Sequence, residues 1–288
     1  FSPKPCIFLL HCCCFCGCLS DNSSGQLGIP RQAGIQKVQR VEALWNNQNS
    51  RKVAIAIAAS EQSTLVLLAP IAGTTHLNSI YEWGHGNHVP MRVHFENTLS
   101  SDESAVKGRG RSKNDFRIGA TNRGIPNPVA IACAKFHNAA IDSDGMVYTW
   151  GLHAESLGRT NKKAGKHNQR QVQQHRNSTP QLVTSMLPEK GGGYAVKIAA
   201  SGQHTAVVTD TGALFTWGTT DSKSVLGHEG LRWQPNPRRV PGVHRVVDVA
   251  LAKEHTVLLV GATFPKIHKA THTTSLESFS ARKVAQYV

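Results

Sequence analysis

The sequence predicts an all-β protein, an incomplete β-propeller of about four blades in which each blade is a four-stranded antiparallel sheet. Three observations predict this fold: a recurring sequence unit, strand-length runs of alternating or β-branched residues inside that unit, and a composition rich in turn residues. The 288 residues include 25 glycines and 13 prolines, and only 6% are aromatic, which is typical of short strands joined by tight turns. Because one such sheet cannot bury both of its faces alone, successive sheets are expected to stack.

The recurring unit occurs twice without gaps, as IACAKFHNAAIDSDGMVYTWG over 131–151 and IAASGQHTAVVTDTGALFTWG over 198–218. Weaker copies begin at residues 57 and 249. One position holds histidine in three copies and Ser63 in the fourth, and a later position holds tryptophan followed by glycine. The structural repeat positions are His137, His204, His255, Trp83, Trp150, Trp217, Gly151 and Gly218.

Four strands are expected, in order, in the unit that contains residues 196–218. Residues 196–200 alternate with a period of two, and residues 205–209 are rich in β-branched side chains. A turn at 210–212 leads to a third strand at 214–217. Arg239 with Val240 suggests a fourth strand, and a proline three residues before a valine recurs as a later landmark of three units, at Pro90, Pro180 and Pro237. The distance from tryptophan to proline varies between units, which is typical of connections that run outside a rigid scaffold.

The net charge of +14 is concentrated in two polar segments. Residues 107–123 contribute +5 and residues 159–176 contribute +6, which leaves +3 for the rest of the chain. Since both segments hold few apolar residues, we expect solvated loop insertions. The alternative is a polybasic arm that binds phosphates, and its candidate polyanion contacts are Lys162, Lys163, Lys166 and Arg170.

The two ends differ in character from the repeats, which we expect to span 20–265. Residues 1–19 hold six of the seven cysteines and are expected to lie outside the fold. Crowded cysteines cannot bridge separate elements, and a zinc site lacks its second pair. The remaining Cys133 fits a reducing compartment. Residues 266–288 are expected to be a linker and a short helix that could begin a downstream domain.

Two stretches, Gly202-Gln203-His204-Thr205 through Leu214, Trp217 and Gly218, and Gly25-Gln26-Leu27-Gly28, resemble repeats of the regulator of chromosome condensation family. The resemblance implies a seven-bladed β-propeller, so this chain is expected to be a fragment of a larger ring. Residues 252–257 and the C-terminal helix resemble the subgroup that includes the inhibitor of Bruton tyrosine kinase. That subgroup implies a BTB/POZ domain downstream.

Patterns that carry chemistry are missing from the sequence. Glycines 191–193 are not followed by Lys-Ser or Lys-Thr, and neither Gly-x-Ser-x-Gly nor His-Glu-x-x-His occurs. We therefore predict no catalytic, cofactor-binding or metal-ligating residue and no enzymatic activity. The repeat histidines are expected to hold the turn between the first and second strands through backbone hydrogen bonds. No apolar run is long enough to span a membrane.

These observations predict a non-enzymatic, protein-binding scaffold in the cytoplasm or nucleus. The resemblance implies the propeller part of a BTB/POZ adaptor or regulator, with a small GTPase or a ubiquitin-ligase component as a partner. Two alternatives stay open. One is guanine-nucleotide exchange on a Ran-like small GTPase, which the founding member of the family performs. The other is association with chromatin or nucleic acid through the basic loops.

Overall fold

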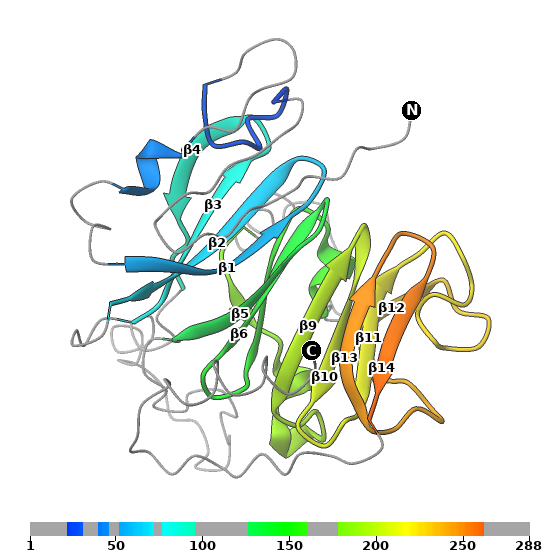
Figure 1. Ribbon diagram of the computed structural model, residues 1–288. Coiled ribbons are helices and arrows are strands. Elements are labelled where there is room, and N and C mark those ends of the chain that lie inside the picture. Colours follow the sequence, from blue (N-terminus) through cyan, green and yellow to red (C-terminus); the bar gives the residue numbers. More distant parts are fainter. Residues whose placement is uncertain are drawn as a thin grey trace, which may run out of the picture.

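The computed structural model describes residues 22–30, 40–45, 52–71, 77–95, 126–159 and 178–261. Within these ranges the regular elements are β-strands and short 3-10 helices, and the strands form four antiparallel sheets that follow one another along the chain (Figure 1). The all-β prediction is therefore confirmed. We call the four sheets blades 1 to 4, in chain order.

Blades 1 to 3 each have four strands, and the strand order in each sheet equals the order in the chain. Blade 1 contains β1 (Lys52–Ala59), β2 (Ser63–Pro70), β3 (Ser79–Gly84) and β4 (Asn87–Arg92). Blade 2 contains β5 (Pro128–Cys133), β6 (His137–Asp142), β7 (Val147–Gly151) and β8 (Gln181–Leu182). Blade 3 contains β9 (Ala195–Ser201), β10 (Gln203–Thr209), β11 (Leu214–Thr219) and β12 (Trp233–Arg239).

Blade 4 has two strands in the described residues, β13 (Val246–Leu251) and β14 (Thr256–Val260). The expected four strands per blade are thus present in three blades. The 3-10 helices η1 (Glu42–Trp45), η2 (Ala154–Leu157), η4 (Thr184–Met186) and η5 (Pro188–Lys190) lie in the connections.

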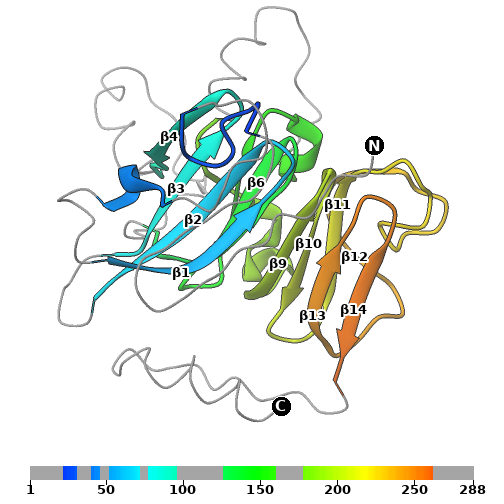
Figure 2. The same ribbon diagram turned by 45° about the horizontal axis from the view of Figure 1, so that its top comes forward.

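The first strands of successive blades lie against one another. Strand β5 contacts β1 and β9, and β9 contacts β13, so these strands form the inner side of the array (Figure 2). Small residues allow this close approach. Ala56 and Ala58 of β1 pack into the cluster between blades 1 and 2, and Ala199 of β9 packs into the cluster between blades 3 and 4.

Each internal blade buries both faces of its sheet, because successive side chains of a strand point to opposite faces. In β6, Ala140 packs toward blade 1 while Ile141 packs toward blade 3. In β10, Val207 packs toward blade 2 and Val208 toward blade 4. The apolar core is therefore a series of layers between blades, so each blade depends on its neighbours for burial.

The valine that follows each Pro landmark makes the same backbone hydrogen bond in all three blades. Its N–H donates to the carbonyl of the first or second residue of the third strand, which fixes where the fourth strand ends. The bonds join Val93 to Ile80, Val183 to Val147 and Val240 to Leu214, with N···O distances of 2.9, 2.8 and 2.8 Å.

Residues 1–19, 107–123 and 266–288 lie outside the described residues, and so do residues 160–176 of the second basic segment. The polyanion contacts predicted at Lys162, Lys163, Lys166 and Arg170 therefore stay predictions. Arg159 is described, and its guanidinium donates to Thr149 and Gln181 of its own blade. No helix in the described ranges has the length and apolar character needed to cross a bilayer.

The glycine after each repeat tryptophan adopts a positive φ: +109° at Gly84, +141° at Gly151 and +113° at Gly218. A Cβ at Gly218 would lie 2.2 Å from the carbonyl oxygen of Gln203. The backbone of the third strand thus approaches the start of the second strand too closely for any side chain.

We predict that Gly218→Ala destabilises the protein by at least about 2 kcal/mol more than Gly202→Ala. Both glycines have positive φ, but Gly202 at +53° lies in the left-handed α region and a Cβ there meets no atom within 4 Å, so the difference reports the clash and the backbone strain at Gly218 together. Urea unfolding followed by circular dichroism measures the difference. Equal losses of stability would show that the close approach is unimportant.

Candidate functional site

A hydrogen bond from the repeat tryptophan joins neighbouring parts of the propeller, and we call this contact a tryptophan seam. The indole Nε1 of Trp83 donates to the carbonyl oxygen of Gln26 at 2.8 Å, and that of Trp217 donates to Ser156 at 2.8 Å. Each acceptor directly precedes a Leu-Gly pair. The indole thereby satisfies its only polar group while its ring is buried.

The glycine of each Leu-Gly pair makes room for the indole. Gly28 lies beneath Trp83 and Gly158 lies beneath Trp217, and both glycines are buried. A Cβ at Gly28 would lie 3.1 Å from the indole nitrogen, and a Cβ at Gly158 would lie 2.8 Å from it. The glycines of these Leu-Gly pairs therefore have a packing role that the residue pattern alone did not reveal.

The residue before the tryptophan holds the Leu-Gly connection of its own blade. In blade 2 the Thr149 hydroxyl donates to the carbonyl oxygen of Leu157 at 2.7 Å. In blade 3 the Thr216 hydroxyl donates to Leu226 at 2.6 Å. A threonine of the same blade thus fixes each connection by a hydrogen bond. In blade 2 the connection also accepts a hydrogen bond from the tryptophan of blade 3.

In blade 1 a carboxylate, instead of a backbone carbonyl, accepts the hydrogen bond from the tryptophan of the next blade. Its third and fourth strands are joined by a tight turn at 85–86, which leaves no Leu-Gly connection to accept a bond from blade 2. Glu82 occupies the position of Thr149 and Thr216. One of its oxygens accepts from Trp150 Nε1 at 2.9 Å, and the other accepts from the amide of Asn138 at 2.8 Å. Glu82 therefore supplies the hydrogen-bond acceptor that the shortened connection of blade 1 lacks.

The repeat histidines do not share one environment. His137 is 1% exposed, and its Nε2 lies 2.6 Å from the hydroxyl of Thr205 in blade 3, while its Nδ1 has no partner in the described residues. The expected bond to the backbone of its own turn is therefore wrong for His137. His204 is also buried, whereas His255 in blade 4 is exposed.

Burial keeps the two inner histidines neutral. Desolvation lowers the pKa of His137 to about 3, with the neighbouring His204 and His153 adding to the effect. Desolvation likewise lowers the pKa of His204 to about 4.

The described residues bring together no group of three or more His, Cys, Asp or Glu side chains that could hold a metal ion. The repeat histidines stand in successive blades. The thiol of Cys133 is buried 3.3 Å from the Ser63 hydroxyl, and burial raises its pKa to about 11. A thiol of that pKa is a poor nucleophile at neutral pH.

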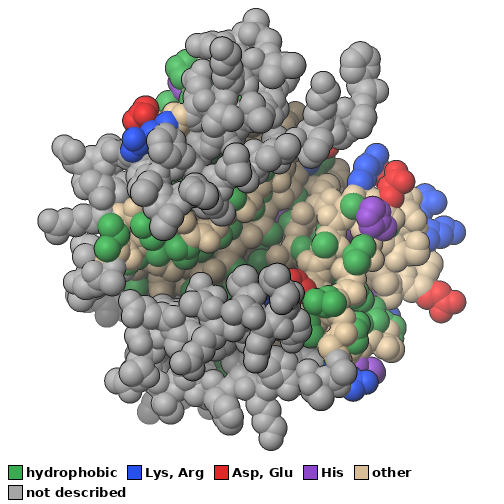
Figure 3. All heavy atoms as spheres, viewed as in Figure 1, with side chains coloured by type: hydrophobic (Ala, Val, Ile, Leu, Met, Phe, Trp, Pro, Cys, Tyr) green, Lys and Arg blue, Asp and Glu red, His purple; other side chains and the backbone are tan. Residues whose placement is uncertain are grey.

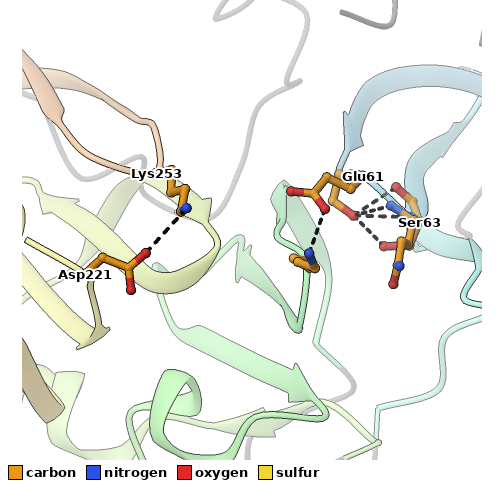
Figure 4. A network of polar contacts seen from close by, with 7 residues as sticks. Glu61, Ser63, Asp221 and Lys253 are labelled. Carbon is orange, nitrogen blue, oxygen red and sulfur yellow. Dashed lines mark hydrogen bonds and ion pairs between the residues drawn. The ribbon is translucent and has the colours of Figure 1, made fainter. Parts of the chain in front are cut away.

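The turns between first and second strands lie beside the connections that follow the third strands, and we call this end of the blades the turn face. Glu61 and Lys135 form an ion pair at 2.8 Å between the turns of blades 1 and 2. Asp221 and Lys253 form another at 3.5 Å between blades 3 and 4 (Figure 4). Such exposed pairs contribute little stability, but they show that these segments lie side by side.

An apolar patch beside the Lys135–Glu61 ion pair occupies the turn face of blade 2. Leu152 is 75% exposed. The half-buried ring of Phe136 lies 6.3 Å from the His153 ring, centroid to centroid, and Lys135 Nζ lies 5.5 Å from the centre of the Phe136 ring. These residues carry no signal in the sequence, because they fall in a turn and a connection, where no periodicity marks them.

Comparison with known proteins supports the family suggested by the repeat. Residues 195–222 and 211–259 match the regulator of chromosome condensation (RCC1) repeat. Protein pim1 of Schizosaccharomyces pombe is 32% identical over 137 residues, which cover 46% of this chain and 24% of pim1. Human E3 ubiquitin-protein ligase HERC2 is 35% identical over 124 residues, which cover 42% of this chain and 2% of HERC2.

Solved structures support the same fold. The structure of Prp20p from Saccharomyces cerevisiae, described with its binding to Gsp1p and histones, superposes with a TM-score of 0.56 at 18% identity. The match covers 83% of this chain and 49% of Prp20p. This chain therefore spans about half of the length of Prp20p and a smaller share of the length of pim1 and HERC2. The subgroup of the inhibitor of Bruton tyrosine kinase is not supported by these matches.

The expectation of a non-enzymatic protein is corrected by these relatives. HERC2 carries a similar stretch and is an E3 ubiquitin-protein ligase, so propeller repeats of this type occur within enzymes. The absence of catalytic motifs concerns only the stretch that matches HERC2, and that stretch is 2% of HERC2. The match lies in the repeat region and is no evidence of ligase activity in this chain.

Glu82→Gln should destabilise the protein by about 1–3 kcal/mol, because the amide nitrogen that replaces one oxygen would face an N–H donor. The exposed Glu189→Gln is the matched control and should be neutral within about 0.5 kcal/mol. Urea unfolding measures the loss. A Glu82→Gln variant as stable as the control would contradict the role of the carboxylate at this seam.

The free energy of unfolding should fall as the pH drops from about 6.5 toward 4. In this window His137 and His204 bind protons in the unfolded chain but stay neutral in the folded protein, because burial lowers their pKa. Each histidine therefore lowers the free energy of unfolding by up to about 1.4 kcal/mol per pH unit. His137→Gln should flatten this dependence, whereas His255→Gln at the exposed equivalent position should not. Chemical unfolding at a series of pH values tests this, and identical slopes for both variants would refute it.

Proposed function

We propose that this chain is a protein-recognition module whose blades present the turn face to a partner protein. The observation that carries the proposal is the patch of Leu152, Phe136 and Lys135. Burying a leucine exposed to this degree against a partner lowers the free energy, and the adjacent ring and the Lys135–Glu61 ion pair add specificity.

The patch is held rigidly, which favours recognition. The backbone N–H groups of Leu152 and His153 donate to the carbonyl oxygen of Phe136 at 2.8 and 3.3 Å. The His153 ring nitrogen lies 2.9 Å from the Ser156 hydroxyl, which donates to Gln203 of blade 3 at 2.6 Å. A connection that is already ordered loses little conformational entropy on binding.

The relatives supply the partner classes to test first. Prp20p is described as binding Gsp1p and histones, and HERC2 is a ubiquitin-protein ligase. A small GTPase, a histone or a ubiquitin-ligase component is accordingly the class of partner we propose. The cytoplasm and the nucleus remain the predicted locations. The narrower role of a BTB/POZ adaptor rests on the sequence resemblance of residues 252–257.

Guanine-nucleotide exchange on a Ran-like small GTPase is the second candidate. The similarity to Prp20p favours it, because exchange by a propeller would need a shaped face and no covalent chemistry. Faster release of a fluorescent nucleotide from such a GTPase in the presence of the full chain would support this candidate, and an unchanged rate would remove it.

Leu152→Asp should abolish partner recognition, since an aspartate would have to be desolvated in the interface. The control is Met91→Asp on β4, where the side chain is 60% exposed but lies on an outer strand. Full-length wild type and both variants are immobilised and offered a Ran-like GTPase, core histones and a cell extract. Bound proteins are measured by quantitative mass spectrometry.

The expected result is at least one protein retained by wild type and Met91→Asp and reduced at least about tenfold by Leu152→Asp. If every retained protein binds all three chains equally, the turn-face patch is not the recognition surface. Circular dichroism of the variants verifies that the blades remain folded.

A further inference from the structure

We propose that the outer strand of blade 3 is a binding site for single-stranded nucleic acid, in which Trp233 stacks on a base and arginines of β12 contact phosphates. The site lies on the fourth strand of a complete blade and does not rest on the proposed recognition of proteins through Leu152. It is also distinct from the basic segments 107–123 and 159–176, because all of its residues are described.

Positive charge is concentrated around β12. Residues 232–245 hold four arginines and neither Asp nor Glu. Their net charge of +4 exceeds the +3 that the chain carries outside its two basic segments, so the remaining residues together carry −1. Figure 3 shows Lys and Arg side chains at the outer margin of the last two blades. The four arginines are Arg232, Arg238, Arg239 and Arg245, and all are exposed.

The strand itself does not require these arginines. Two residues separate the landmark proline from its valine in each of three blades, and they differ between blades. The segments read PMRV at 90–93, PQLV at 180–183 and PRRV at 237–240. All three form the same backbone hydrogen bond at the valine. The arginine pair of blade 3 is therefore available for a role other than folding.

The arginines of β12 are not neutralised by nearby carboxylates. Within the described ranges Arg232, Arg238 and Arg239 form no ion pair. Exposed lysines of other strands and turns do form such pairs: Lys135 with Glu61, Lys197 with Asp248 and Lys253 with Asp221. Neighbouring positive charges without counter-charges raise the local potential, which attracts phosphates.

An exposed tryptophan accompanies the arginines. Trp233 is 51% exposed, whereas the repeat tryptophans Trp83, Trp150 and Trp217 are at most 2% exposed. The indole of Trp233 thus presents apolar ring surface to water, and a stacked base would cover it. Stacking of bases on aromatic rings beside a basic surface is the usual way in which proteins bind single strands.

The register of the sheet places Trp233 and Arg239 on one face. Trp233 lies opposite Thr219 of β11, and Arg239 lies opposite Phe215. Residues directly opposite each other share a face, and Phe215 packs toward blade 2. Four residues of β11 separate Thr219 from Phe215, so the two side chains start about 13 Å apart along the strand. One extended strand of nucleic acid can therefore contact both.

A peptide fits this strand less well than a nucleic acid. A peptide that extended the sheet would need N–H donors from β12, and Pro235 and Pro237 have none. The side-chain amide of Gln234 already donates to the carbonyl oxygen of Asn236 at 2.8 Å. Recognition must therefore come from side chains. A planar indole and guanidinium groups suit bases and phosphates, and in a duplex the bases are hidden within the stack.

The test measures binding of a fluorescein-labelled oligouridine of about eight nucleotides to the full-length chain by fluorescence anisotropy. We expect saturable binding that weakens as salt is raised. Contacts to about three phosphates give a slope of log affinity against log salt of at least about −2, so affinity falls by at least about 15-fold between about 50 and 200 mM salt.

Two pairs of variants assign the binding to β12. Arg239→Gln should weaken binding at least about threefold and reduce the salt slope by about 0.7. Arg92→Gln, at the equivalent position of blade 1, is the matched control and should change neither. Trp233→Ala should weaken binding at least about fivefold and leave the salt slope unchanged. Its control is Tyr194→Ala, an aromatic residue that is 41% exposed outside β12, and binding should stay unchanged.

Four outcomes would overturn the proposal. They are no binding, equal affinity of wild type and Trp233→Ala, equal effects of Arg239→Gln and Arg92→Gln, and an oligoglutamate of the same charge that binds as tightly as oligouridine. The last result would assign the strand to acidic proteins. Circular dichroism verifies that the variants are folded. A failure here with retained Leu152-dependent recognition would leave the proposed function standing.

Discussion

Burial of both faces of each internal sheet is the constraint on which this structure depends. Ala140 and Ile141, adjacent in β6, pack against blades 1 and 3 respectively, so no blade can be removed without exposing the apolar face of the next. The tryptophan seams set the relative position of the blades within these layers. An indole that donates to a backbone carbonyl fixes both distance and register, because a misplaced ring would leave a buried N–H without a partner.

The seams are built from interchangeable parts. In blade 2 a long connection follows the third strand, and the Thr149 hydroxyl donates a hydrogen bond to that connection. The carbonyl oxygen of Ser156 in the same connection accepts the hydrogen bond from the tryptophan of the next blade. Where the connection is a tight turn, Glu82 supplies both acceptor oxygens itself. The variable connections can therefore change in length without disturbing the layers, and this leaves them free to form recognition surface on the turn face.

The strands of blade 3 were predictable because their pattern is local. The alternation over 196–200 and the turn at 210–212 correspond to β9 and to the turn between β10 and β11. The extent of β12, which contains Pro235 and Pro237, was not predictable, because an edge strand tolerates proline and shows no apolar period. The bond of His137 to Thr205 was also missed, since it joins residues of different blades.

The sequence by itself determined that this is an all-β repeat protein, because the unit recurs with the same internal spacing and its strands are marked by an alternating run, a β-branched run and the turn that follows. It also marked the tryptophans and glycines as equivalent. Only the tertiary structure decided what these residues contact and that Glu82 replaces a missing connection. The physical reason is that seams join residues from different repeats, and no local pattern encodes which surface of a neighbouring blade a side chain will meet.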